Sequence, residues 1–156
     1  MIERREGLIV VARQDLRAKE AIEAAGCLSV QMSFLRAHAS VPLARALIRR
    51  VVGAWEFDKP LVQDIELVAS ELCTNAVLHG AASRLGCFDV RLAPQPRGLR
   101  IEVADAGPGP VDRPAPSALA ENGRGLLLVS RMCESWGLDA TSDGTVVWAE
   151  LRTDTA

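Results

Sequence analysis

Alternating apolar and polar residues predict the strands of this chain. Residues 28–34, LSVQMSF, place apolar side chains on one face and polar side chains on the other, the pattern of a half-buried strand. The same alternation recurs in residues 88–92 and 99–103, and a proline- and glycine-containing turn separates them. This arrangement predicts an antiparallel hairpin. The apolar stretch TVVWAEL, residues 145–151, predicts a last strand.

Two segments after the first strand have helical periodicity. Between residues 40 and 55, apolar side chains recur every three or four positions, and Ser40 is a residue type that can cap the start of a helix. A second helix is predicted over residues 58–79, ended by Gly80. Its apolar residues share one arc of the helix, and Ser70 points away from that arc.

Three polar residues stand at intervals of four in the second helix. The stretch SELCTNAVLHG, residues 70–80, contains Glu71, Asn75 and His79 among mostly apolar or small neighbours. A buried asparagine costs about 1–3 kcal/mol if it is left unpaired. In isolation, the ordinary explanation is that Asn75 bonds to nearby backbone and Glu71 faces water. Two further stretches favour a functional explanation.

The first of these stretches follows the strand that ends at Asp105. In DAGPGP the Asp105 carboxylate can accept a hydrogen bond from an exocyclic amine such as that of adenine, and Gly107 and Gly109 let the backbone turn without a Cβ in the way. Alone, this would be an ordinary turn. It opens a proline- and glycine-rich loop over residues 106–125, and long loops in compact domains are often functional lids.

The second stretch, NGRGLLLV, leads from that loop into a helix predicted over residues 126–137. Amides at a helix start attract phosphate, and Arg124 adds positive charge. Neither GxxxxGK[ST] nor a GxGxxG at the start of a βαβ unit occurs. A bound nucleotide would therefore need a metal ion to neutralise its phosphates. The Asn75 oxygen is a plausible Mg²⁺ ligand, and Glu71 could accept a proton from an attacking hydroxyl.

The order of elements is strand, two helices, two strands, loop, helix, strand. It predicts an α+β fold, a two-layer α/β sandwich whose mixed, mostly antiparallel sheet carries its helices on one face. We expect residues 1–26 to form an N-terminal extension, with a short helix over 15–25, and residues 27–156 to form the domain.

Composition narrows the class of protein. Eighteen basic and twenty acidic residues give a net charge of −2, so a direct nucleic-acid partner is not expected. No apolar run approaches the roughly 20 residues of a membrane span. The four cysteines lack metal-site spacing. These features predict a cytoplasmic protein with reduced thiols.

The three stretches in this order, ExxxNAxxH, DxGxG and GxGLxLV, resemble the N, G1 and G2 boxes of the Bergerat-fold (GHKL) ATPases, which share a histidine-kinase-like ATPase domain. SELCTNAVLHG and GRGLLLVSRMCESWG are most similar to the bacterial anti-sigma-factor serine/threonine kinases. The resemblance covers roughly residues 28–151.

The resemblance implies a function and a set of roles. The activity would be ATP-dependent, Mg²⁺-dependent phosphorylation of a serine or threonine on a STAS-domain anti-anti-sigma protein. A sigma factor, held inactive by binding, would be the other partner, and homodimers are common in the family. The implied catalytic base is Glu71, the implied metal ligand is Asn75, and Asp105 would read adenine. The implied nucleotide pocket also includes Gly107, Gly109, Gly123, Arg124, Gly125 and Leu126.

One departure concerns the last strand. The family often has a glycine–lysine–threonine–valine–tryptophan run whose threonine helps to close the pocket. With Trp148 as the reference, Val146 stands at the threonine position here. Thr145, the remaining ATP-binding candidate, would then point to the opposite face of the strand. This predicts a weaker adenine-side hydrogen bond.

Two alternatives remain beside the kinase. One is a non-catalytic module that sequesters a partner, with nucleotide only modulating its shape; the departure at Val146 favours it, whereas Glu71 favours the enzyme. The other is the ATP-binding half of a split histidine kinase. It is the weaker of the two, because the chain shows no phosphoacceptor helix and has only His38 and His79 as histidines.

Overall fold

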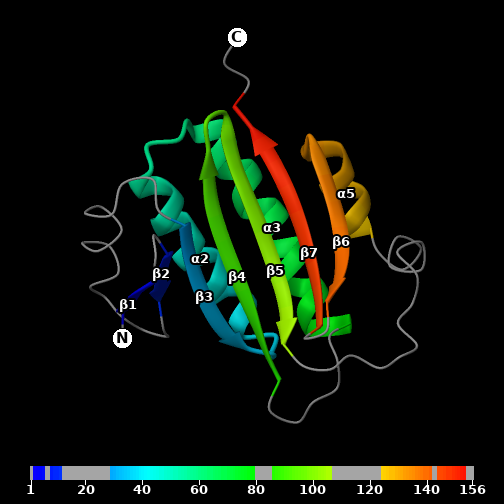
Figure 1. Cartoon of the computed structure of the whole chain (residues 1–156). Coiled ribbons are helices and arrows are strands. Elements are labelled where there is room, and N and C mark those ends of the chain that lie inside the picture. The colour runs from blue at the N-terminus through cyan, green and yellow to red at the C-terminus, as the bar shows by residue number, and fades with distance from the viewer. Residues whose placement is uncertain are drawn as a thin grey trace.

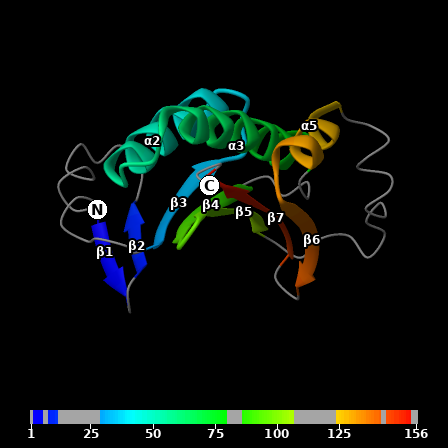
Figure 2. The same ribbon diagram turned by 90° about the horizontal axis from the view of Figure 1, so that it is seen from above.

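A computed structural model describes residues 2–5, 8–11, 29–79, 86–106, 124–141 and 144–153. In these ranges the chain forms a two-layer α+β sandwich, in which three helices cover one face of a single curved sheet (Figures 1 and 2). The predicted fold class is confirmed. The strands are β1 (Ile2–Arg5), β2 (Leu8–Val11), β3 (Ser29–Leu35), β4 (Cys87–Gln95), β5 (Gly98–Ala106), β6 (Ser135–Thr141) and β7 (Gly144–Arg152). The helices are α2 (Ser40–Ala54), α3 (Lys59–His79) and α5 (Arg124–Met132).

The sheet has the strand order β1-β2-β3-β4-β5-β7-β6. Neighbouring strands are antiparallel except for β2 and β3, which are parallel. The predicted β4–β5 hairpin is confirmed, and Gln95 pairs with Gly98 across its turn. Strands β1 and β2 lie within the segment expected to be an extension, and they continue the sheet beyond β3. The short helix expected over residues 15–25 lies outside the described residues.

The core lies between the sheet and the helices, and strand alternation builds it. On β4 and β5 six alternate residues face the helices and are at least 97 % buried, as period-two alternation allows. These residues are Phe88, Val90, Leu92, Leu99, Ile101 and Val103. The Phe34 and Phe88 rings stack with 5.5 Å between centroids. From the opposite layer, the apolar arc of α3 supplies Leu61, Ile65, Val68, Ala69 and Leu72.

The two long helices begin differently. At α3, the Asp58 carboxylate accepts a hydrogen bond from the Leu61 N–H at 2.8 Å, the geometry of an N-cap. The expected Ser40 cap of α2 is wrong. Ala39 holds the cap position without a side-chain hydrogen bond, and a backbone bond from Ser40 N–H to the Ala37 carbonyl (2.9 Å) forms the turn instead.

Packing between α2 and α3 buries one residue that the sequence pattern turns outward. Ser70 is 6 % exposed, although it points away from the apolar arc of α3. Arg45 of α2 donates a hydrogen bond to its hydroxyl at 2.7 Å, and that hydroxyl donates to the Glu66 carbonyl. The neighbouring helix, rather than the sheet, covers this serine.

The helix predicted over residues 126–137 is wrong at its C-terminal end. Helix α5 ends at Met132, and β6 begins at Ser135 as an edge strand paired with β7. A Cβ at Gly137 would lie 2.7 Å from the Trp148 ring, so this strand is packed directly against an indole. The helical periodicity of residues 126–137 does not include Trp148, so it could not show that residues 135–137 pair with β7 as a strand.

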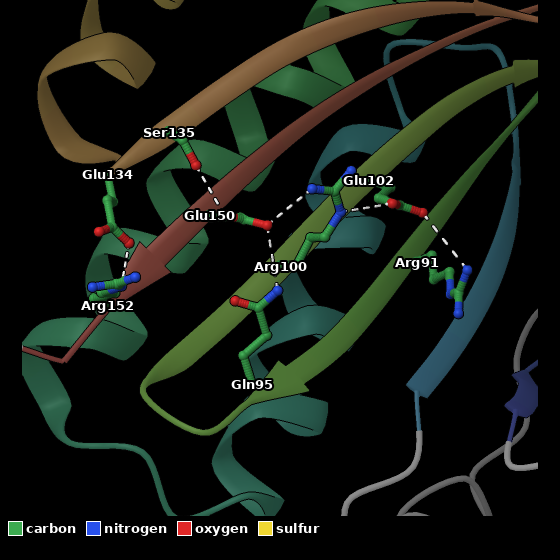
Figure 3. Close-up of polar contacts among 8 residues, drawn as sticks. All are labelled: Arg91, Gln95, Arg100, Glu102, Glu134, Ser135, Glu150 and Arg152. Carbon is green, nitrogen blue, oxygen red and sulfur yellow. Dashed lines mark hydrogen bonds and ion pairs between the residues drawn. The ribbon is translucent and has the colours of Figure 1, made fainter.

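The face of the sheet away from the helices carries a network of ion pairs (Figure 3). Arg100 contacts Glu102 at 2.8 Å and Glu150 at 2.9 Å, and its guanidinium lies 4.3 Å from the Trp148 ring centroid. Arg100 lowers the pKa of the Glu150 carboxyl by hydrogen bonding to it. Arg91 reaches Glu102 at 3.8 Å. Each partly exposed ion pair of this kind contributes little to the stability of the fold. The uncharged core residues of the same strands lie on the opposite face of the sheet.

Replacement of the α3 cap tests how this helix is anchored. We expect Asp58→Ala to lower the free energy of unfolding by about 1 kcal/mol, because the Leu61 N–H loses its partner. Asp58→Asn is the matched control, since asparagine caps about as well. Urea unfolding followed by circular dichroism measures both variants. An alanine variant as stable as the asparagine variant would contradict the cap.

Candidate functional site

Glu71 and Asn75 lie one turn apart on α3, and both are half-buried. The helix packs against α5, β5 and β7, so its C-terminal half runs over the end of the sheet where β5 finishes and β7 begins (Figure 1). His79 is the last residue of α3, and its side chain lies outside the described residues. The spacing of four residues places these polar side chains along one side of the helix, because four residues make about one turn.

The Glu71 carboxylate packs against the start of α5. A Cβ at Gly125 would overlap Glu71 Oε2 and would lie 3.3 Å from Glu71 Cδ. Only glycine therefore fits at position 125 without a shift of the carboxylate. This contact brings the two predicted motifs together: the polar line of α3 and the glycine-rich start of the following helix, which are separated by more than forty residues in the chain.

Helix α5 begins at Arg124, whose side chain lies outside the described residues. Leu126 is buried against the core and so fixes the first turn of the helix beside Glu71. Backbone amides in the first turn of a helix have no partner within the helix. The glycines at 107, 109 and 123 lie outside the described residues.

Asp105 and Thr145 face each other on the helix side of the sheet. Cross-strand pairing joins Phe34 to Phe88, Phe88 to Asp105, and Asp105 to Thr145. Directly opposed residues share one face of a sheet, and the two phenylalanines are core residues. The row therefore starts in the hydrophobic core and ends with a carboxylate and a hydroxyl on the same face.

This register corrects the expectation for Thr145. Thr145 and Val146 lie on opposite faces of the strand, as the count from Trp148 predicted, but the face of Thr145, and not that of Val146, is the one that carries the Asp105 carboxylate. Val146, one residue on, faces the other side. The Thr145 hydroxyl oxygen is buried and has no hydrogen-bond partner among the described residues. A buried hydroxyl without a partner is costly, which suits a position completed by a ligand.

Arg36 is a further candidate residue that none of the three motifs contains. Its guanidinium Nη2 forms an ion pair with Asp105 Oδ1, and the two side chains are 10 % and 11 % exposed. The signal was present in the alternation of β3, since Arg36 stands two positions after the core residue Phe34. A charged residue at the next core-facing position needs a partner.

A metal centre built from several protein ligands and catalysis by the Cys73 or Cys133 thiol receive no support from the described residues. They contain no group of three or more histidine, cysteine, aspartate or glutamate side chains placed to hold a metal ion. Burial raises the pKa of the Cys73 thiol to about 12 and that of the Cys133 thiol to about 11, with Asp64 adding to the second shift. These two thiols are therefore protonated at neutral pH and are poor nucleophiles.

None of the described helices is long and apolar enough to cross a membrane.

Comparison with known proteins connects this geometry to a family. The profile of the histidine kinase-like ATPase domain matches residues 34–151, a range that contains every site residue discussed above. No curated protein sequence matches the chain.

A solved structure has the same fold. It is the crystal structure of the RsbU and RsbW domains of Rv1364c from Mycobacterium tuberculosis, with a TM-score of 0.59 and 19 % sequence identity. The match covers 82 % of this chain and 33 % of that one, so this chain corresponds to about a third of the longer protein. Because the family profile spans most of the sequence, the chain belongs to the histidine kinase-like ATPase domain family.

Proposed function

We propose that this protein binds ATP with Mg²⁺ and acts as an anti-sigma-factor-type serine/threonine kinase. Its proposed substrate is a STAS-domain anti-anti-sigma protein, and a sigma factor is its proposed second partner. Membership of the ATPase-domain family supports nucleotide binding. The observation that carries the proposal is the packing of the Glu71 carboxylate against Gly125, on the same side of the sheet as Asp105 and Thr145.

The residues present fit the base of a nucleotide. Asp105 can accept a hydrogen bond from the exocyclic amine of adenine, and the buried Thr145 hydroxyl beside it can donate to or accept from a neighbouring ring atom or water. The orphaned hydroxyl supports the fit, because a bound base would complete a group that otherwise lacks a partner. The glycines at 107 and 109 are proposed to shape the same pocket.

The phosphate end would lie at the start of α5. Gly123, Arg124 and Gly125 are proposed to hold it, because the amides of a first helical turn and a guanidinium both favour anions. Asn75 would hold the magnesium ion through its side-chain oxygen, a ligand type that Mg²⁺ prefers. The ion, when bound, neutralises phosphate charge.

Glu71 would act as the general base. Its carboxylate takes the proton of the substrate serine or threonine hydroxyl as that oxygen attacks the terminal phosphorus. Its contact with Gly125 positions it beside the proposed phosphate-binding turn. A module that only sequesters a partner would not need a carboxylate at this place. The Thr145 hydroxyl on the same face as Asp105 supports a nucleotide pocket although Val146 stands at the family's threonine position.

Calorimetry and phosphate transfer test the proposal together. We expect wild-type protein to bind ATP only weakly without Mg²⁺, and Asn75→Ala to lose most of the Mg²⁺-dependent gain. Glu71→Gln should keep ATP binding but lose transfer of radiolabelled phosphate to candidate STAS proteins by about 10²-fold or more. Tight partner binding without transfer by the wild type would favour the sequestering module. Equal affinity of Asn75→Ala and wild type would contradict the metal role.

Removal of the Thr145 hydroxyl should stabilise the nucleotide-free protein and weaken its binding of ATP. We expect Thr145→Val to raise the free energy of unfolding by about 1 kcal/mol without nucleotide, because a buried, unpaired hydroxyl is removed. The same substitution should weaken ATP binding. Chemical unfolding with and without ATP measures both effects. A variant destabilised without nucleotide would show that the hydroxyl already has a partner.

Because Gly125 packs closely against the Glu71 carboxylate, its substitution should reduce phosphate transfer more than it reduces stability. Glu71 Oε2 is the end of a flexible side chain, so in Gly125→Ala we expect the carboxylate to move, transfer to fall about tenfold or more, and stability to change little. The matched control is Gly53→Ala. A Cβ at this helix residue meets nothing within 4 Å, so Gly53→Ala should gain about 0.5–1 kcal/mol of stability and keep full transfer. Unchanged transfer in Gly125→Ala would contradict the positioning of Glu71.

A further inference from the structure

The ion pair between Arg36 and Asp105 adds a residue to the proposed site that no motif contains. Both side chains are about nine-tenths buried, so the pair is not a surface contact. Arg36 directly follows the last residue of β3, and Asp105 is the last residue but one of β5, with β4 between the two strands. The guanidinium therefore reaches across one strand to contact the carboxylate.

The backbone holds Arg36 in place for this contact. Its N–H donates to the Gly86 carbonyl at 2.9 Å, just before β4 begins. The preceding residue, Leu35, pairs with Cys87 in the last step of the β3–β4 ladder. The stacked Phe34 and Phe88 rings lie in the neighbouring row. The backbone of Arg36 is thus held at the end of the β3–β4 ladder, from which its side chain reaches Asp105.

The chemistry of a buried carboxylate explains what the arginine does. A carboxylate withdrawn from water tends to take up a proton unless a cation stays beside it. Once protonated, it could donate as well as accept, whereas the ionised form only accepts. An arginine stays charged at any ordinary pH and directs its donors in a fixed plane. An ion pair of this kind favours the ionised, acceptor-only form of a carboxylate.

We infer that Arg36 is a positioning residue that makes the base pocket selective for a 6-amino purine. This inference rests on the proposed nucleotide function. An acceptor-only carboxylate pairs with the amine of adenine, and it repels the carbonyl oxygen that a 6-oxo purine presents at the same place. A carboxylate has about four acceptor positions on its two oxygens, so it can accept from a guanidinium and from a base at the same time.

The experiment compares two nucleotides on the full chain. ATP carries the 6-amine, and purine riboside triphosphate carries hydrogen there. By calorimetry we expect Arg36→Ala to bind ATP about tenfold more weakly than wild type, the value of one hydrogen bond, and to bind the amine-free analogue with unchanged affinity. A general disturbance of the fold would weaken both nucleotides equally.

Two further variants make the comparison decisive. Arg36→Lys keeps the charge without the planar fork, so it should lose less ATP affinity than Arg36→Ala, and it replaces the alanine variant should that one fail to fold. Arg91→Ala is the matched control, because it removes an arginine from a half-exposed ion pair on the opposite face. It should change neither affinity, and thermal unfolding confirms that all variants are folded.

Several results would overturn the inference. Equal losses for both nucleotides would reduce Arg36 to a structural role. Tighter ATP binding by Arg36→Ala would show that the arginine competes with the base. Unchanged ATP affinity would refute the inference alone, whereas a wild type that binds neither nucleotide would refute the proposed function itself.

Discussion

Burial of one face of the sheet beneath α2 and α3 is the constraint on which the rest of the structure depends. Strand alternation sorts every residue of β4, β5 and β7 to one of two faces. The helix face becomes the core, and the other face carries a network of charged side chains. A polar side chain on the helix face must therefore be paired, completed by a ligand, or held at the rim.

The proposed site lies where the core-facing rows run out of apolar residues. The row from Phe34 through Phe88 continues into Asp105 and Thr145. On the helix layer, the apolar arc of α3 gives way to Glu71 and Asn75. The two layers thus replace hydrophobic contacts with polar groups at the same end of the sandwich. A rigid core that supports polar groups at its edge is a suitable frame for a binding site.

The fold class and the pairing of the central hairpin follow from local pattern. Period-two alternation and a short turn are properties of neighbouring residues, so β4 and β5 could be read directly, as could the length of α3. The strand β6 could not be predicted from local pattern in this way. Residues 135–137 follow a helix without a strong break, and their conformation is decided by pairing with β7 and by the Trp148 ring. The positions of β1 and β2 in the sheet likewise depend on partners distant in the chain.

The sequence by itself determined the candidate residues, because motif spacing records which side chains share a helix turn or follow a strand. Glu71, Asn75 and Asp105 were identified in that way. Only the tertiary structure decided which of them meet other elements. Strand register put Thr145 opposite Asp105, β3 delivered Arg36 to the same carboxylate, and helix packing set Glu71 against Gly125. Local periodicity specifies the face on which a side chain lies, whereas contacts between distant segments depend on register and packing, which arise only when the layers close over a common core.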